Sequence, residues 1–286
     1  MKPKILINQE VLLPLISSEF DIVYSMSNDV DLGICIDIPL DETDINSLIC
    51  LNKKVIGTKR LTKIQQYILL KNFNINTPKT FYNEQTLNPL HSVDLFNCYI
   101  DLEEIVIKPN EGARGIGVKK ILSKDYLDCL YSDKFTLFTE DKLLESNEKN
   151  YDMDAKSYIE QSFRYSSFLF QEVIDVKREF RLIIFKNNGY VIYERLKKEG
   201  QFLGNLSEGS EAIKVSLEDC KKYIQPLIEK FYPLMDKMNY PWLSIDVYID
   251  KKDDVGVFEF QMEFAYRGFD AKIIKNLLIQ TVKQYL

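Results

Sequence analysis

The chain has little of the chemistry on which many enzymes depend. It contains a single histidine, His91, in a polar Asn-Pro-Leu-His-Ser segment, which leaves almost no basis for a Ser-His-Asp triad or a histidine-rich metal site. Its five cysteines are scattered without a Cys-x-x-Cys pair, which argues against structural zinc and indicates reduced thiols in a cytoplasmic protein. The sequence therefore disfavours histidine-dependent and zinc-dependent chemistry.

Long apolar runs and an excess of basic charge are also missing. No run is long enough for a transmembrane helix, and the first residues lack the apolar segment of a signal peptide. A net charge of −6 provides no basic surface for duplex nucleic acid. Because hydrophobic residues make up 45% of the chain, we expect a globular fold with a sizeable core. Nucleic acid and membranes are not expected partners, and a homo-oligomer is left open.

Hydrophobic periodicity predicts strands and helices arranged in three parts. Short β-branched runs near the start are typical of strands, and residues 61–72 carry an apolar stripe typical of a helix. The predicted parts are an N-terminal α/β domain (1–75), a central lobe (76–170) and a C-terminal lobe (171–286). In the last lobe, residues 216–219 resemble a capping box for a helix that runs through Tyr232.

A glycine-rich segment in the central lobe is typical of a phosphate-binding loop. A β-branched strand, 105–107, leads into Lys108 and then into a loop with Gly112, Gly115 and Gly117. Glycines allow backbone N–H groups to converge on an anion, and Lys108 adds a positive charge. No Gly-Lys-Ser/Thr follows, and the next segment is a strand, so Walker A and dinucleotide motifs are excluded. We predict a flap over nucleotide phosphates; the alternative is a hairpin with a mobile glycine turn.

Two alternating segments on either side of a polar turn, 251–254, predict a β-hairpin in the C-terminal lobe. If Asp250 pairs with Val255, then Asp246 lies opposite Glu259 on one face. Opposed carboxylates on a buried hairpin repel each other unless a cation lies between them. The hairpin is therefore a candidate cation site.

The same hairpin offers further oxygen ligands. Gln261 follows Glu259 on the same face, and such oxygen ligands suit Mg²⁺ or Mn²⁺ that bridges nucleotide phosphates. Phe258 and Phe260 indicate that the opposite face is buried. The alternative interpretation is a solvent-facing acidic edge.

Arginines lie on the two strands that precede the hairpin. Arg178 and Arg181 flank Glu179 on one predicted strand, and Arg195 ends the next. Guanidinium groups bind phosphates through a bidentate fork. The usual alternative for any one of them is a surface ion pair.

The order of these parts resembles that of a known superfamily. In chain order they are a lysine at a helix start, strand-Lys-Pro with its glycine flap, Gln-Glu-Val-Ile, Glu-x-Arg, an Arg-to-Asn segment and an Asp…Glu-x-Gln hairpin. Together they resemble the ATP-grasp superfamily, and the segment 194–210 is similar to that of ribosomal-protein glutamate ligases (RimK-like). The resemblance covers roughly residues 55–270. It implies an α/β protein with α+β lobes, an ATP-grasp fold preceded by a small N-terminal α/β pre-ATP-grasp domain.

The resemblance implies nucleotide contacts residue by residue. Lys63 matches the first ATP-contacting lysine, and Lys108 matches the strand lysine near the α-phosphate. Asp175 or Glu179 is expected to meet the ribose or to order Arg181. The other implied contacts are the flap glycines and the hinge whose backbone binds adenine, namely Gly112, Gly115, Gly117, Gln171, Glu172, Val173 and Ile174.

Catalytic and metal-binding roles follow from the same resemblance. The implied catalytic residues are Arg195, Arg181 and Asn205. The implied ligands of Mg²⁺ or Mn²⁺ are Asp246, Glu259 and Gln261. Gln261 stands where the family usually has asparagine, so its amide oxygen is one methylene further from the backbone.

The implied activity is that of an ATP-dependent carboxylate–amine ligase. ATP would phosphorylate a carboxylate to an acyl phosphate, from which an amine displaces phosphate, and the substrates would be amino acids or a peptide. Such chemistry needs charge neutralisation more than a nucleophilic side chain, which suits a chain with one histidine. The alternatives are an ATP-binding partner protein that has lost catalysis and a small-molecule kinase.

Overall fold

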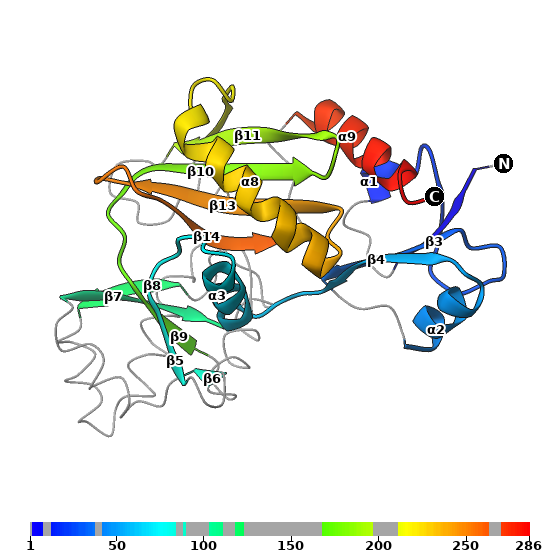
Figure 1. The fold of residues 1–286 in the computed structure, drawn as a ribbon, viewed down its shortest axis with the longest axis horizontal. Coiled ribbons are helices and arrows are strands. Elements are labelled where there is room, and N and C mark those ends of the chain that lie inside the picture. The colour runs from blue at the N-terminus through cyan, green and yellow to red at the C-terminus, as the bar shows by residue number, and fades with distance from the viewer. Residues whose placement is uncertain are drawn as a thin grey trace.

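Three sheets carry the fold in the computed structural model (Figure 1). The structure describes residues 2–7, 13–37, 42–83, 88–89, 103–110, 118–122, 168–196, 211–262 and 270–286. Over these ranges, no helix combines the length and the apolar character needed to cross a membrane.

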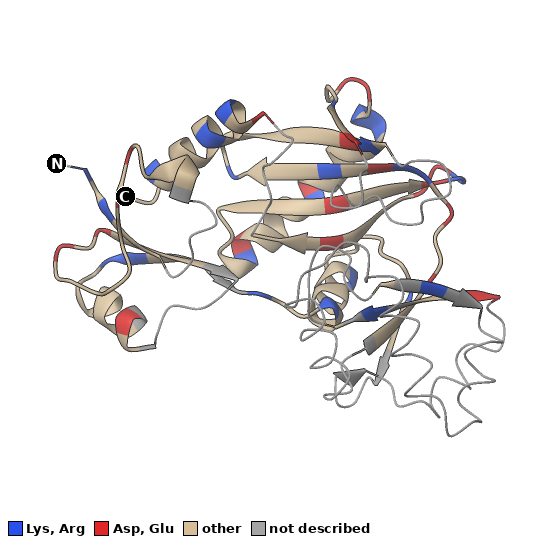
Figure 2. Cartoon of the chain, turned by 180° about the vertical axis from the view of Figure 1, so that it is seen from behind, with Lys and Arg blue, Asp and Glu red and all other residues tan. Residues whose placement is uncertain are grey.

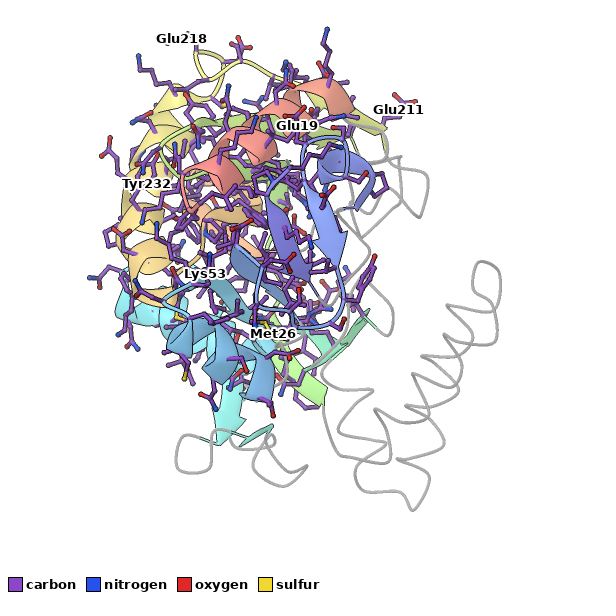
Figure 3. The ribbon with its side chains drawn as sticks, turned by 90° about the vertical axis from the view of Figure 1, so that its right-hand side faces the viewer. Glu19, Met26, Lys53, Glu211, Glu218 and Tyr232 are labelled. Atoms are coloured by element: carbon purple, nitrogen blue, oxygen red, sulfur yellow. The ribbon has the colours of Figure 1, made fainter. Side chains whose placement is uncertain are left out.

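The N-terminal sheet consists of four parallel strands in the order β2-β1-β3-β4. They are β1 (Lys4–Ile7), β2 (Asp21–Val23), β3 (Leu32–Asp37) and β4 (Lys54–Lys59). Parallel neighbours need crossover connections, and these contain α1 (Leu13–Ile16) and α2 (Glu42–Cys50). Lys283, at the end of the chain's last helix, forms an ion pair with Glu19 at 3.0 Å, and Figure 3 shows Glu19 beside that helix. The last helix of the chain therefore lies against the segment around α1.

The central sheet has five antiparallel strands in the order β6-β5-β9-β7-β8. They are β5 (Thr80–Asn83), β6 (Asn88–Pro89), β7 (Glu104–Pro109), β8 (Lys119–Leu122) and β9 (Phe168–Glu172). Helix α3 (Lys63–Asn72) precedes this sheet in the chain. The pairing of β7 with β8 confirms a strand on each side of the glycine segment. The loop itself, with Gly112, Gly115 and Gly117, lies outside the described residues.

The C-terminal sheet also has five antiparallel strands, in the order β12-β11-β10-β13-β14. They are β10 (Val176–Phe185), β11 (Gly189–Leu196), β12 (Glu211–Lys214), β13 (Trp242–Asp250) and β14 (Val255–Gln261). Helix α8 (Lys221–Met238) lies across one face of this sheet, and α9 (Ala271–Lys283) lies beside α1 (Figure 1).

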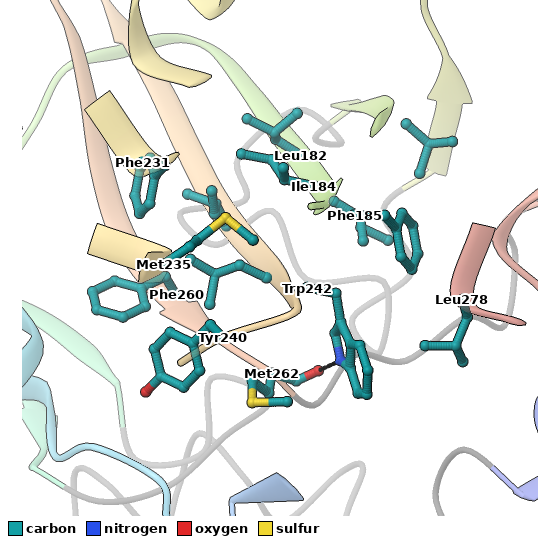
Figure 4. Close-up of a cluster of buried hydrophobic side chains, with 14 of the residues drawn as sticks. Leu182, Ile184, Phe185, Phe231, Met235, Tyr240, Trp242, Phe260, Met262 and Leu278 are labelled. Atoms are coloured by element: carbon teal, nitrogen blue, oxygen red, sulfur yellow. Dashed lines mark hydrogen bonds between the residues drawn. The ribbon is translucent and has the colours of Figure 1, made fainter. Parts of the chain in front are cut away.

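One continuous core joins the N-terminal and C-terminal sheets. In it, the ring of Phe260 on β14 meets Phe231 of α8 edge to face at 5.9 Å. Trp242 is fully buried, and its indole N–H donates a hydrogen bond to the Met262 carbonyl at 3.0 Å (Figure 4). A buried indole needs such a partner for its N–H. The shared core fixes the N-terminal sheet against the larger one.

Strand β14 is the outer strand of its sheet, and its free edge is covered by α3 and the residues that follow. The buried Gln66 accepts a hydrogen bond from the Phe260 N–H at 2.9 Å and donates one to the Leu61 carbonyl at 3.1 Å. The Val257 N–H donates to the Asn76 carbonyl at 2.8 Å. These bonds satisfy backbone groups that an edge strand would otherwise leave open.

The hairpin of β13 and β14 differs from the predicted one at its turn. Val255 pairs with Ile249 rather than with Asp250. The Asp250 carboxylate accepts two backbone N–H groups of the turn, at 2.8 Å each, which draws this residue into the turn. An irregularity in register after Asp246 takes up one extra residue on β14, and Asp246 still lies opposite Glu259.

That extra residue changes the face on which Phe258 lies. Its ring is 4.6 Å from that of Tyr248, which lies two residues from Asp246 on the same face of β13. Phe260 alone packs into the core with Phe231. The prediction that both phenylalanines share the buried face is therefore wrong for Phe258.

Helix α8 also begins later than predicted. Ser216 and Asp219 hydrogen-bond to each other at 2.7 Å in a turn that precedes the helix, which starts at Lys221 and continues beyond Tyr232 to Met238. A local side-chain bond can stabilise a turn as well as a helix cap, and here it does the former.

We expect Gln66→Leu to lower the free energy of unfolding by about 1–3 kcal/mol, because it leaves the buried Phe260 N–H without an acceptor. Urea unfolding measures this change. Gln284→Leu, at an exposed position on the last turn, is the control and should shift stability by less than about 0.5 kcal/mol. Equal stability of both variants and the unaltered protein would contradict the role given to Gln66.

Candidate functional site

Asp246 and Glu259 are at the centre of the site. They lie directly opposite each other on β13 and β14, as predicted, and their side chains are 19% and 23% exposed. Figure 2 shows acidic and basic positions on adjacent strands of this sheet. Two partly buried carboxylates at neighbouring positions require positive charge close by.

Two arginines supply positive charge to Asp246. Arg181 lies next to it across β10 and β13, with Nε 2.5 Å and Nη2 3.2 Å from the carboxylate oxygens. Arg195 on β11 donates from Nη2 to Asp246 at 3.0 Å and from Nη1 to Glu179 at 2.7 Å. Glu179 and Arg195 are direct cross-strand neighbours. The sheet therefore brings these four predicted residues together, and Glu179 orders Arg195 rather than Arg181.

The environments of the two arginines differ. Burial acts to lower the pKa of Arg195, but Asp246 and Glu179 outweigh it and raise that pKa. For Arg181 burial prevails over the attraction of Asp246, and the pKa is lowered. Both groups remain charged, since arginine does not lose its proton in proteins. The carboxylates of the protein therefore compensate the charge of Arg181 less fully than that of Arg195.

Each guanidinium group has one buried N–H donor without a partner among the described residues. The Nε–H groups of Arg181 and Arg195 have no hydrogen-bond acceptor among the described residues. The Arg181 Nε is near Asp246, but its N–H is not directed at the oxygen. Buried donors are nearly always paired, and an unpaired one costs about 1–3 kcal/mol. An anion with several oxygen acceptors, such as a phosphate group, would accept hydrogen bonds from both Nε–H donors.

Lys108 faces the same carboxylates from β7. It is buried, and it interacts electrostatically with Lys63, Glu259 and Asp246. Burial, followed by the charge of Lys63, lowers the pKa of Lys108 to about 7, while the two carboxylates oppose this change. A bound anion would favour the charged form of the amine.

The residue after β7 holds the two lysines together. The Asn110 carbonyl accepts the Lys63 N–H at 2.9 Å, and the Asn110 side-chain oxygen accepts the Ile64 N–H at 3.1 Å. Asn110 therefore caps the first turn of α3 from the start of the glycine segment. Lys63 and Lys108 approach each other because of this link.

The predicted hinge connects the central and C-terminal sheets. Gln171 and Glu172 end β9, and Val173 and Ile174 lead into β10. The Gln171 amide is buried and donates to the Thr80 hydroxyl at 2.5 Å, so this side chain belongs to the central sheet. Any contact of the segment with a ligand would come from its backbone.

Arg60 belongs to the site although the sequence did not indicate it. Its Nη2 lies 3.1 Å from Gln261 Oε1 and 3.6 Å from Glu259 Oε1. Arg60 is one of many charged residues, follows β4, and is 201 positions away from Gln261 in the chain. Only the docking of the N-terminal sheet on the C-terminal one brings these side chains together.

The oxygen atoms of this site suit a hard divalent cation. Asp246 and Glu259 offer opposed carboxylates that are not fully buried, and Gln261 follows Glu259 by two residues on β14. Mg²⁺ and Mn²⁺ take oxygen ligands, and Mg²⁺ usually completes its shell with phosphate oxygens and water. Among the described residues, no group of three or more histidine, cysteine, aspartate or glutamate side chains could hold a metal ion.

The described part of the site carries an excess of positive charge. Its basic residues are Arg60, Lys63, Lys108, Arg181 and Arg195, and its carboxylates are Glu179, Asp246 and Glu259. The chain as a whole is acidic, with a net charge of −6, so this local excess favours an anionic ligand. Asn205 lies outside the described residues.

Comparison with known proteins places this arrangement in a recognised fold. The sequence matches no protein-family model and no curated protein significantly. A D-alanyl-alanine synthetase A from Vibrio cholerae has a TM-score of 0.62 at 14% identity, covering 99% of this chain and 98% of that one. A RiPP-associated ATP-grasp ligase from Chryseobacterium gregarium has a TM-score of 0.60 at 11% identity, covering 100% and 98%. This chain has the ATP-grasp fold.

Other solved structures agree with this assignment. The D-alanine–D-alanine ligase from Bacillus anthracis, complexed with ATP, has a TM-score of 0.59 at 15% identity and covers 99% of this chain and 96% of its own. The ATP-grasp fold implied by the motif order is therefore confirmed over nearly the whole chain. The similarity to RimK-like enzymes stays a prediction.

We expect Glu179→Leu to lower the free energy of unfolding by about 3–5 kcal/mol, because it removes a partner of the buried Arg195. The double variant Glu179→Leu/Arg195→Leu should recover much of this loss, since no buried charge is then left unpaired at this pair. Urea unfolding separates the two outcomes. The exposed Glu218→Gln serves as the control and should not change stability measurably. A single variant as stable as the unaltered protein would refute the role of this ion pair.

Proposed function

We propose that this protein is an ATP-dependent carboxylate–amine ligase that works through an acyl phosphate. The observation that supports this most directly is the pair of guanidinium groups of Arg181 and Arg195 beside Asp246, whose buried Nε–H donors have no hydrogen-bond acceptor among the described residues. Together with Lys108 they form a site suited to phosphate oxygens. The ATP-grasp fold supports the same conclusion, because solved structures with this fold include ligases complexed with ATP and with ADP.

In the proposed reaction, a carboxylate oxygen attacks the γ-phosphorus of ATP and the bond to the bridging oxygen of ADP breaks. An amine then attacks the acyl carbon, the bond to phosphate breaks, and the amine nitrogen loses a proton. Arg181 and Arg195 would neutralise charge on the transferred phosphoryl group, and Lys108 would bind the nucleotide phosphates. A divalent metal at Asp246 and Glu259, when bound, would add further neutralisation.

The substrate class is proposed from the structural neighbours. They include a D-alanine–D-alanine ligase, an ATP-grasp ligase in complex with a leader and core peptide, and a D-cycloserine synthetase. These proteins act on, or were studied with, amino-acid-like molecules and peptides, so we propose an amino acid or a peptide as the substrate here. Gln171, Glu172, Val173, Ile174, Glu179 and Lys63 are proposed nucleotide contacts, and Asn205 is a proposed catalytic residue.

Trapping with hydroxylamine would test the acyl phosphate directly. We expect ATP, Mg²⁺ and hydroxylamine, with a panel of amino acids and short peptides, to yield ADP together with a hydroxamate of one panel member. Arg181→Met, which removes the less fully matched cation, should abolish the hydroxamate. ADP formation with a phosphate ester and no hydroxamate would indicate a kinase, and ATP binding without turnover over the whole panel would favour the partner-protein alternative.

Nucleotide binding should be coupled to proton uptake by Lys108. Its pKa is about 7 in the free protein, so at pH 8 the amine is mostly neutral, and bound phosphate should raise the pKa and draw in a proton. Phosphate groups ionise near pH 6 and contribute little at pH 8. Below about pH 6 the lysine is already charged and uptake should vanish.

Calorimetry of ATP binding at pH 8, in two buffers of different ionisation enthalpy, measures this uptake. We expect the unaltered protein to take up close to one proton for each ATP bound. Lys177→Met, at an exposed position on β10, should take up the same number, and Lys108→Met should take up none. The same uptake in the Lys108 variant would assign the proton to another group.

A further inference from the structure

Arg60 occupies the oxygens of the candidate metal site. It lies between β4 and α3, outside the C-terminal sheet, and reaches β14 with a side chain that is 27% exposed. One of its nitrogens, Nη2, is 3.1 Å from Gln261 Oε1 and 3.6 Å from Glu259 Oε1. These are two of the three oxygens that a divalent cation on this hairpin would use.

The orientation of the Gln261 amide follows from this contact. A guanidinium group has only donors, so the oxygen of the amide, and not its nitrogen, must face Arg60. The atom that would ligate a metal is therefore directed at Arg60. The extra methylene of glutamine, compared with asparagine, carries this oxygen further from the β14 backbone.

Arginine contacts all three candidate ligands. Arg181 and Arg195 hold Asp246 from the β10 side, and Arg60 holds Glu259 and Gln261 from the β14 side. Mg²⁺ binds its oxygen ligands at about 2.0–2.1 Å. A metal on Gln261 Oε1 would thus lie within about 5 Å of the Arg60 Nη2 at its observed position, and the two cations would repel each other.

We propose that Arg60 competes with the divalent metal for Glu259 and Gln261. In the nucleotide-free protein its guanidinium pairs with the Glu259 carboxylate and donates to the Gln261 amide oxygen, and it withdraws from both when metal and nucleotide bind. The proposal rests on the proposed function for the presence of metal and nucleotide, but not on the identity of the other substrate. Arg60 is on this view a positioning residue that sets the affinity for metal.

The competition can be measured without any turnover. Electron paramagnetic resonance of free Mn²⁺, in the presence of saturating ADP and with the Mn²⁺ bound by ADP alone subtracted, reports Mn²⁺ bound to the protein. We expect Arg60→Gln to bind Mn²⁺ about five- to tenfold more tightly, because the variant removes the screened repulsion between one unit positive charge and the metal. Arg60→Lys keeps the charge but loses the fork, so its gain should be about two- to threefold.

The control removes a positive charge from the same N-terminal unit at a distance from β14. Lys53 pairs with Asp31 at 3.5 Å and is labelled in Figure 3, and Lys53→Gln should leave Mn²⁺ affinity unchanged. Thermal unfolding of each variant checks that it is folded, and Arg60→Lys carries the test if Arg60→Gln does not fold cooperatively.

The outcomes separate this inference from the proposed function. Unchanged or weaker Mn²⁺ binding in folded Arg60 variants would overturn the competition alone, and would mean that Arg60 supports the ligands or does not affect them. An equal gain in Mn²⁺ affinity in Lys53→Gln would also overturn the competition, because the gain would then follow from the net charge of the protein and not from the position of Arg60. If the unaltered protein binds neither ADP nor Mn²⁺, both the proposed function and the competition fail.

Discussion

The buried ionic chain formed by Glu179, Arg195, Asp246 and Arg181 is the constraint on which the rest of the site depends. It crosses three adjacent strands, β11, β10 and β13. Charges can be buried only when they are matched, and a slip of one residue in either pairing would move them to the opposite face. The register that buries the hydrophobic core is therefore the same register that completes this ionic chain.

The other charged groups approach this chain from separate parts of the sequence. Lys108 comes from the central sheet, Lys63 from the helix that Asn110 caps, and Arg60 from the connection after β4. Among the residues that the structure describes, no histidine or cysteine takes part in these contacts. Such an assembly provides positive charge and hydrogen-bond donors in a partly dry setting, where electrostatic interactions are stronger than in water. Such an environment would suit the phosphoryl transfer proposed for this site, because the barrier of that reaction depends mainly on charge.

The local pattern of the sequence predicted the strands and the opposition of Asp246 to Glu259, and both are confirmed. It did not predict that Asp250 would be drawn into the turn by its own hydrogen bonds, nor that Phe258 would consequently lie beside Tyr248. Alternation along a strand carries no information about an extra residue, and turn chemistry decided this register. The later start of α8 has the same origin, a side-chain bond between Ser216 and Asp219.

By itself, the sequence determined the strands that carry Arg181, Arg195, Asp246 and Glu259, and it disfavoured histidine-based chemistry. These features depend on local periodicity and on composition, whereas the class of fold was implied by the order of the motifs along the chain. The tertiary structure alone decided that Glu179 pairs with Arg195, that Gln66 holds the edge of β14, and that Arg60 meets Gln261. Each of these contacts joins residues on different elements, and it exists only because burial of a common core brings those elements together.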